Sequence, residues 1–471
     1  MSGTQNAPWR GFKGGVSAGT EEQDLDIARA GAATPRKSVK QIAQRIFREV
    51  LASIDIGATL ARTLARKSTF IQAGDLLIDL RAFREIVAIA YGKAAFAMAT
   101  GLVEVLAPDF RAQGILAVPW EPPRALPGWD TFIAGHPIPN EQSFLAGRAI
   151  LDRLRKCDER SLIFFLLSGG GSTLVEQPLD ASASLEDFQQ LHHALVTCGA
   201  PIEEMNAVRK HLSATKGGRL AALAPQAMKL TLGVTDVPEG HESALASGPT
   251  LPDPTTVADA ERVAREYRIL EKLPVSLRAA FERHALVETP KAGDAVFKRA
   301  CFVLLLGMHD LLHCAHRAAE CHGFRTLCDY STDNWPLERA ANHLLAVLAA
   351  LKNANPERPV AVIADGEVSS PVTGEGVGGR NSAFVLTCVP KIAGKPIAIL
   401  SAGTDGIDGN SPAAGAVADG ESLGRARAAG LESADVLRRS DSYGFFERLG
   451  DAIITGPTGN NLRDLRILLA R

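Results

Sequence analysis

The sequence predicts an α/β fold in which a mostly parallel sheet is covered by helices on both faces. Three short apolar runs, residues 86–90, 162–167 and 229–234, each lead into a turn or helix-start pattern. Nearly continuous apolar strands between helices are typical of parallel sheets, because such strands are buried on both faces. Ligands of these sheets bind at the carboxyl ends of the strands, so these turns mark the expected site.

The length of 471 residues is too great for one ordinary core, which favours two domains. Prolines at 249, 252 and 254 indicate the junction between them. We therefore expect a poorly ordered extension over residues 1–35, a first domain over 36–254 and a second α/β domain over 255–471. Runs at 360–364, 396–400 and 452–455 supply further strands after the junction, as does the buried strand 302–307.

Several helices have recognisable starts. Apolar residues recur at helical spacing from about residue 36, and Ser184 with Asp187 forms a capping box ahead of the next clear helix. Pro201 is placed to begin a helix over residues 202–212. Residues 255–285 have a helical pattern throughout.

Composition excludes several classes of protein. The net charge of −2 gives no electrostatic reason to expect a nucleic acid or an anionic membrane as partner. No apolar run approaches the roughly 20 residues that a membrane span requires. The seven cysteines are odd in number and scattered, which suits a reducing cytoplasm.

A glycine-rich turn after the second apolar run is the clearest motif, and it consists of Ser168, Gly169, Gly170, Gly171 and Ser172. Consecutive glycines let backbone N–H groups approach an anion, and a following helix adds the positive end of its dipole. The turn therefore predicts phosphate binding, with a tight strand-to-helix turn without ligand as the alternative. Its spacing fits neither a Walker loop nor a dinucleotide fingerprint.

Charged residues follow other strands of the expected sheet. Lys93 comes after Gly92 at a strand end, where it could neutralise a phosphoryl group or remain a solvated surface lysine. Asp236 closes the third strand and is a candidate Mg²⁺ ligand or general base, unless it only caps the next turn. Arg209 and Lys210 belong to a dense basic cluster that could hold a carboxylate or simply face solvent.

The second half carries a similar set of residues. Arg380 begins a helical run after Gly378 and Gly379, with Asn381 beside it, and is the best candidate for stabilising a phosphoryl group. Two carboxylates, Asp405 and Asp408, lie in a glycine-rich strand end and could coordinate a divalent cation or form ordinary Asp-Gly turns. A histidine and cysteine group between residues 309 and 328 fits a core-packing helix better than a zinc site.

Six motifs in this order resemble the class II glycerate kinases, the glycerate 2-kinase family with a MOFRL-type C-terminal domain. They are SGGGS, NAVRKHLS, SGPTLPDPTT, GVGGRN, GTDGIDG and TGPTGNN. The resemblance runs from about residue 36 to the C-terminus. The chain departs from the family pattern at residues 235–242, where His241 replaces an acid, and at Met308 and His309.

The resemblance implies ATP- and Mg²⁺-dependent phosphorylation of D-glycerate at its 2-hydroxyl, in a cleft between a Rossmann-like N-terminal domain and the C-terminal domain. It implies catalytic roles for Lys93 and Arg380. We further expect ATP phosphates on the glycine turns at 168–172 and 378–381, and Mg²⁺ on Asp236 or Asp405.

Arg209 and Lys210 would then hold the substrate carboxylate. An NAD(P)-linked hydroxypyruvate reductase and a non-catalytic binding protein remain the alternatives, and a homodimer is compatible with the sequence.

Overall fold

The computed structural model describes residues 38–235, 237 and 240–471. The expected extension over residues 1–35 and the candidate Asp236 both lie outside these described residues. Over the described ranges, no helix is both long and apolar enough to cross a membrane.

The first sheet has six strands, all parallel, in the order β5-β4-β3-β6-β7-β8. Its strands are β3 (Glu85–Tyr91), β4 (Gln113–Val118), β5 (Trp129–Ile133), β6 (Ser161–Ser168), β7 (Met228–Val234) and β8 (Ala300–Leu306). The chain runs outward from β3 to β5 and then returns to the other side of β3 with β6. This strand order places the topological switch point, where ligands of doubly wound sheets bind, between β3 and β6.

Alternate residues of these strands enter different cores, which explains their unbroken apolar sequence. Phe164 and Leu166 of β6 pack into the core that contains α2 (Ile56–Leu64) and α3 (Ala95–Leu106). Phe165 and Leu167 of the same strand pack with α4 (Glu141–Leu154) and α8 (Arg219–Leu223). The prediction of a mostly parallel sheet buried on both faces is thus confirmed.

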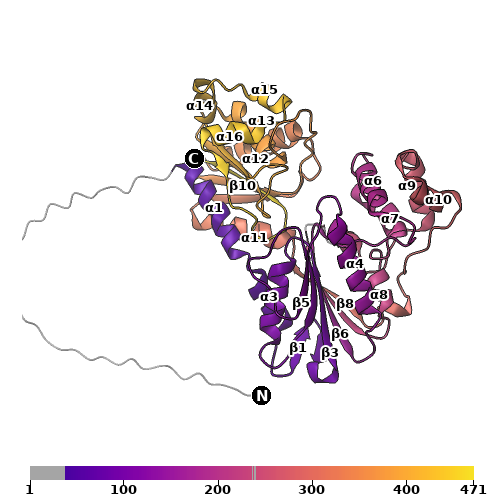
Figure 1. The fold of residues 1–471 in the computed structure, drawn as a ribbon. Coiled ribbons are helices and arrows are strands. Elements are labelled where there is room, and N and C mark those ends of the chain that lie inside the picture. The colour runs from indigo at the N-terminus through magenta and orange to yellow at the C-terminus, as the bar shows by residue number, and fades with distance from the viewer. Residues whose placement is uncertain (1–37, 236, 238–239) are drawn as a thin grey trace, which may run out of the picture. The chain divides into compact units, whose positions relative to one another are not determined.

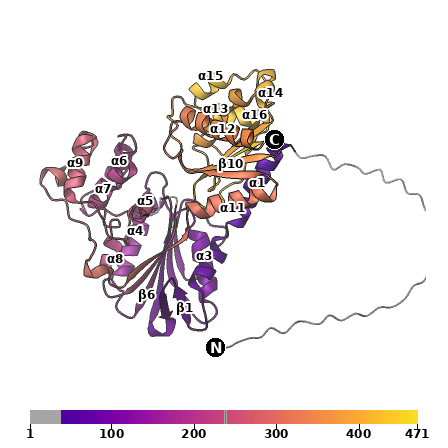
Figure 2. The ribbon, with the colours of Figure 1, turned by 180° about the vertical axis from the view of Figure 1, so that it is seen from behind.

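The remaining elements of this part include a separate group of helices. Their bounds are α4 (Glu141–Leu154), α5 (Gly171–Leu174), α6 (Leu185–Val196), α7 (Ile202–Leu212), α8 (Arg219–Leu223), α9 (Val257–Glu266) and α10 (Val275–Glu282). Helices α6, α7, α9 and α10 share a small core of their own and lie together in both views (Figures 1 and 2). The antiparallel pair β1 (Phe70–Ala73) and β2 (Leu76–Asp79) completes this part.

The predicted helix starts are confirmed where their signals are local. Ser184 caps α6 in a capping box with Asp187, and α7 begins directly after Pro201. The expected continuous helix over residues 255–285 is wrong, because α9 ends at Glu266 and α10 begins only after Pro274. Between them Arg268 has a positive φ of 51°, which ends the α-helical path, and a short 3₁₀ turn over Leu270–Lys272 follows before Pro274.

The second sheet is mixed, in the order β13-β12-β11-β14-β10-β9. Only β9 (Arg325–Asp329) and β10 (Val360–Asp365) are parallel neighbours. The other strands are β11 (Ile397–Gly403), β12 (Gly415–Asp419), β13 (Ala452–Ile453) and β14 (Asp464–Ala470). The helices of this part are α11 (Met308–Cys321), α12 (Leu337–Ala354), α13 (Arg380–Ile392), α14 (Ser422–Ala428), α15 (Ser433–Arg438) and α16 (Ser442–Leu449).

Each sheet contacts a segment that lies on the other side of the junction expected at residue 254. Strand β8 follows that junction and still pairs with β7 in the first sheet. Conversely, α1 (Val39–Ser53) begins the described chain and lies beside α11, against β11, β12 and β14 (Figures 1 and 2). Within α1, Lys40 Nζ lies 2.8 Å from Asp451 Oδ1, and Glu49 Oε2 lies 2.9 Å from His322 Nε2.

Candidate functional site

Lys93 is positioned by a tight turn at the switch point of the first sheet. Gly92 follows β3 with φ of +123°, and a Cβ at this position would lie 2.2 Å from Ser168 Oγ. The N–H groups of Lys93 and Ala94 donate to Gly169 O at 3.0 Å and to Ser168 Oγ at 2.9 Å. Only glycine fits at position 92, and the turn that carries Lys93 is fixed by the loop after β6.

The glycine-rich turn at 168–172 is largely engaged with the protein itself. Ser168 accepts a backbone hydrogen bond, and Ser172 Oγ lies 2.8 Å from Ser247 Oγ. Helix α5 after the turn is only four residues long, so its dipole is small. Gly170 lies against Lys93 and His136, and a Cβ there would come within 3.4 Å of Lys93 Cγ. The turn thus supports Lys93, and its binding of phosphate stays a prediction.

Arg380 is the first residue of α13, at the end of the second glycine turn. Its Nε donates to Asp464 at 2.5 Å and its Nη2 donates to Glu367 at 2.5 Å. Burial alone would lower the pKa of Arg380, but the two carboxylates outweigh burial and raise this pKa. The guanidinium is therefore permanently charged and held from two sides.

The start of α13 is held by Asp408. This carboxylate accepts hydrogen bonds from the backbone N–H groups of Asn381 at 2.9 Å and Ser382 at 2.8 Å, and from Ser382 Oγ at 2.6 Å. Asp408 thus caps the helix terminus, whereas Asp405 of the same loop accepts the Ile407 N–H at 3.0 Å and the Lys93 ammonium at 2.6 Å. Asn381 is also engaged, because its Oδ1 accepts from Ser401 at 2.6 Å.

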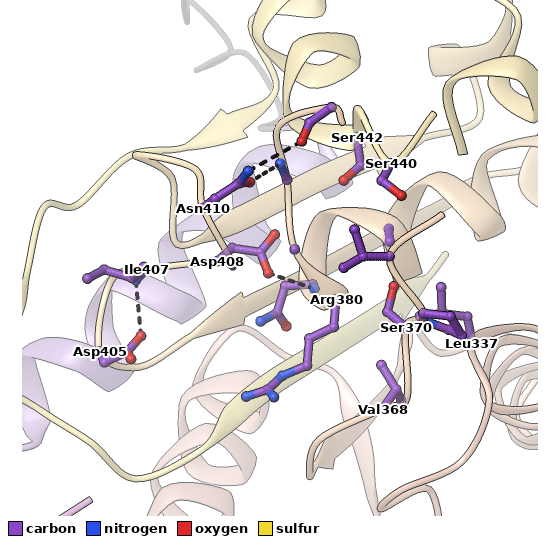
Figure 3. A pocket seen from close by; sticks show the side chains of 18 of the residues that line it. Leu337, Val368, Ser370, Arg380, Asp405, Ile407, Asp408, Asn410, Ser440 and Ser442 are labelled. Atoms are coloured by element: carbon purple, nitrogen blue, oxygen red, sulfur yellow. Dashed lines mark hydrogen bonds between the residues drawn. The ribbon is translucent and has the colours of Figure 1, made fainter. Parts of the chain in front are cut away.

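One cavity of about 900 Å³ brings the two candidate cations together. Lys93 and Arg380 both line it, as do Gly378, Gly379 and Asp405. Figure 3 shows Arg380 and Asp405 in the cavity wall. Lys93 follows β3 and Asp405 follows β11. The Nζ of Lys93 lies 2.6 Å from the Oδ2 of Asp405. Residues that are 312 positions apart in the chain are therefore in direct contact at the site.

His136 is a cavity residue that the sequence interpretation missed. It follows β5, and its Nδ1 lies 3.1 Å from Thr173 Oγ1. Burial, together with the charge of Lys93, lowers its pKa to about 4, although Asp405 acts in the opposite direction. The ring is therefore neutral near pH 7. Its place at a strand end of the same sheet was the signal that could have identified it.

The basic pair Arg209 and Lys210 is not brought to this cavity. Lys210 is buried and forms an ion pair with Asp253 at 3.0 Å. Arg209 is buried as well and donates to Asn206 Oδ1 at 3.3 Å, and no carboxylate of the described chain lies within ion-pair distance of it. Neither residue lines the cavity, so their role in holding a carboxylate stays a prediction.

Metal-binding groups are sparse in the part of the chain that the structure describes. No group of three or more histidine, cysteine or acidic side chains is arranged to hold a metal ion there. In the histidine and cysteine group, Cys328 lies 3.6 Å from His316 without further ligands. Asp405 offers one carboxylate, which fits Mg²⁺ because this ion is commonly held by one or two carboxylates together with substrate phosphates.

Fold and site together define an α/β protein with a lysine at the switch point of the first sheet and an arginine that line one cavity. Comparison with known proteins agrees with this class. Residues 42–282 match the family described as "Domain of unknown function (DUF4147)", and residues 360–464 match the MOFRL family. The chain belongs to the glycerate kinase family with a MOFRL C-terminal domain.

Individual relatives cover most of the chain. A D-glycerate 2-kinase of Thermotoga maritima is 34% identical over 386 residues, which cover 81% of this chain and 90% of the relative. A relative from Agrobacterium vitis, named provisionally as a hydroxypyruvate reductase, is 35% identical over 92% of this chain and 94% of its own. The crystal structure of a Thermotoga maritima glycerate kinase has a TM-score of 0.76 at 32% identity and covers 92% of this chain and 99% of its own.

Proposed function

We propose that the protein is a glycerate 2-kinase that transfers the terminal phosphoryl group of ATP to the 2-hydroxyl of D-glycerate. The observation that carries this proposal is the convergence of Lys93 and Arg380 on one cavity at the switch point of the first sheet. The relatives named as glycerate 2-kinases support the choice of substrate. Phosphoryl transfer needs alignment and charge neutralisation more than covalent chemistry, and this site supplies both.

Lys93 and Arg380 have different tasks in this proposal. Among the described residues Lys93 has one carboxylate partner, Asp405 at 2.6 Å, and its other N–H donors would neutralise the transferring phosphoryl group. Arg380 is fixed through Nε and Nη2, which leaves Nη1 to donate to a phosphate oxygen. Charged donors that are already in place stabilise developing charge without reorganisation during the reaction.

Mg²⁺ is the expected cofactor, and Asp405 is the described residue that would hold it. A bound Mg²⁺ would neutralise charge on the phosphates. The predicted ligand Asp236, outside the described residues, keeps its proposed role as second carboxylate. The glycines at 168–172 and at 378–379 remain the proposed phosphate-binding backbone, and Arg209 remains the proposed partner of the substrate carboxylate.

His136 adds a neutral group to the same end of the cavity. Because Thr173 occupies its Nδ1, the other ring nitrogen is available to hydrogen-bond a substrate hydroxyl. The seven cysteines are all free, which supports work in a reducing compartment such as the cytoplasm.

Incubation with ATP, Mg²⁺ and D-glycerate, followed by NMR of the product, tests the proposal. The expected product is 2-phosphoglycerate, and 3-phosphoglycerate would show that the other hydroxyl reacts. A parallel reaction with hydroxypyruvate and NADH, followed at 340 nm, tests the reductase alternative. Oxidation of NADH without any phosphoglycerate would overturn the kinase assignment.

A further inference from the structure

The wall of the cavity changes in chemistry along its length. Lys93 and Asp405 form an ion pair in one part of the wall. Apolar side chains gather in another part, and they are Leu337, Val368, Pro371, Val372 and Leu437. In Figure 3, Leu337 and Val368 lie on the opposite side of Arg380 from Asp405. The cavity thus has one end with the Lys93–Asp405 ion pair and another where apolar side chains predominate, with Arg380 between them, although Trp120 and Ile407 also line it and Glu338 lies next to Leu337.

The apolar end is built from three segments of the second part of the chain. Leu337 is the first residue of α12, Val368 follows β10, and Leu437 belongs to α15. Val368 is only 3% exposed and gives a fixed wall, whereas Val372 is 83% exposed. A single exposed valine is ordinary on a surface, but here it borders a cavity beside other apolar side chains. A ligand in the cavity would cover it.

The size and chemistry of the substrates decide which of them fits this end. D-Glycerate is a three-carbon acid with polar groups on every carbon, so it has no surface that matches an apolar wall. The faces of an adenine base are apolar, and a nucleotide suits a cavity of about 900 Å³ far better than glycerate alone does. The triphosphate requires cations, which lie at Arg380 and beyond it at Lys93.

We propose that the apolar end of the cavity, formed by Leu337, Val368 and Val372, holds the adenine base of ATP. The triphosphate then passes Arg380 and presents its terminal phosphate at Lys93. This inference rests on the proposed function for the identity of the phosphoryl donor. It assigns the base to the second part of the chain and the reacting groups to the switch point of the first sheet.

One polar side chain at the apolar end is available to contact the base. Ser370 lines the cavity beside Leu337 and Val368, and its hydroxyl makes no hydrogen bond to any other residue in the described ranges (Figure 3). A hydroxyl can both donate and accept, as the edge of adenine requires. Ser440 is less available, because its Oγ accepts the N–H of Thr373 at 2.9 Å.

Calorimetric titration of Val372→Ser with Mg²⁺-ATP and, separately, with Mg²⁺-tripolyphosphate tests the inference. The variant should bind ATP about 4-fold more weakly, since a covered methyl group contributes roughly 0.8 kcal/mol, and should bind tripolyphosphate with unchanged affinity. Val275→Ser is the matched control, because Val275 is 71% exposed on α10 and does not line the cavity. Leu337→Ser should reproduce the selective loss.

Unchanged ATP affinity in both variants would overturn the inference, as would equally weakened binding of ATP and tripolyphosphate. Absence of ATP binding by the wild-type protein would overturn it as well. A variant that binds D-glycerate more weakly and ATP normally would also overturn it, because the apolar end would then hold glycerate instead of adenine. Calorimetry needs no turnover, so selective loss of ATP affinity supports the inference even if no phosphoglycerate forms. Failure of the proposed function is thereby distinguishable from failure of the adenine assignment.

Discussion

At the scale of single residues, the site depends on how each charge is compensated. Among the described residues Lys93 has one carboxylate partner and Arg380 has two, so each cation in the cavity wall is paired. Both still have N–H donors that no described residue uses. His136 beside Lys93 stays neutral, because a second positive charge there would be buried and repelled.

Removal of either cation should reduce catalysis strongly. Lys93→Ala and Arg380→Ala are each expected to lower kcat/KM for phosphorylation of D-glycerate by about 100- to 1000-fold, as loss of a charged transition-state donor does. Lys272→Ala serves as control, because Lys272 is exposed and has no ion pair with any described residue. Steady-state kinetics decide the matter, and values within a few-fold of wild type would refute both roles.

His136 should make the folded state sensitive to mild acid. Its pKa is about 4 in the folded protein against 6.5 in the unfolded chain, so below pH 6.5 the unfolded state binds the proton and the folded state does not. The histidine therefore lowers the free energy of unfolding as pH falls from 6.5 towards 4, by about 2 kcal/mol at pH 5.

The pH effect is measured by urea unfolding at pH 7 and pH 5. His136→Asn, which keeps a hydrogen-bonding group near Thr173, should lose less stability between the two pH values than wild type. Equal losses in the two proteins would show that His136 is not the responsible group.

At the scale of elements, the start of α13 illustrates why some parts of the site were predictable and others were not. The capping boxes of α6 and α9 are formed by residues three positions apart, and such pairs are visible in the sequence. Helix α13 instead receives its cap from Asp408, which is 27 residues away from Asn381. The sequence interpretation offered Asp408 as a cation ligand, and the structure shows a second role for it, since it accepts three hydrogen bonds from the start of α13.

Loss of this cap should affect both stability and activity. Asp408→Ala leaves two backbone N–H groups of α13 unpaired and is expected to cost about 2–4 kcal/mol. Because Arg380 begins the same helix, kcat/KM should fall as well, even at temperatures where the variant is folded. Asp259→Ala removes the acceptor of the Thr256 N–H in the exposed capping box of α9 and should cost about 1 kcal/mol with unchanged kinetics. Thermal unfolding and kinetics of both variants provide the test.

At the scale of the whole described chain, the two sheets are tied together by segments that cross the expected junction. Helix α1 precedes the first sheet in the chain but packs on the second, and β8 follows Pro254 but pairs with β7. One apolar core contains residues of α1 and of both sheets, among them Phe164 and Ile467. The described residues 38–471 accordingly form one compact unit.

Phe47 of α1 tests this organisation. It is fully buried, and Phe47→Ala should cost about 3–5 kcal/mol. Hydrogen exchange should accelerate most in β11 and β14, against which α1 packs, and less in β3 and β6. Phe188→Ala makes the same change in the separate core of α6 and should spare the second sheet. Faster exchange in β3 and β6 than in β11 and β14 would contradict this packing.

The sequence by itself determined the features that depend on local chemistry. Apolar runs, glycine turns and helix caps predicted the parallel sheet, the turn that carries Lys93 and the start of α13 at Arg380, because each signal lies within a few residues. The motif order also indicated the family.

Only the tertiary structure decided which of these residues meet. Lys93 contacts Asp405, Lys210 forms an ion pair with Asp253, and His136 lines the cavity. Such contacts between distant segments follow from how the two sheets and their helices pack. The glycine turn at 168–172 illustrates the difference: its residues predicted a phosphate site, which stays a prediction, and packing shows in addition that the turn supports Lys93.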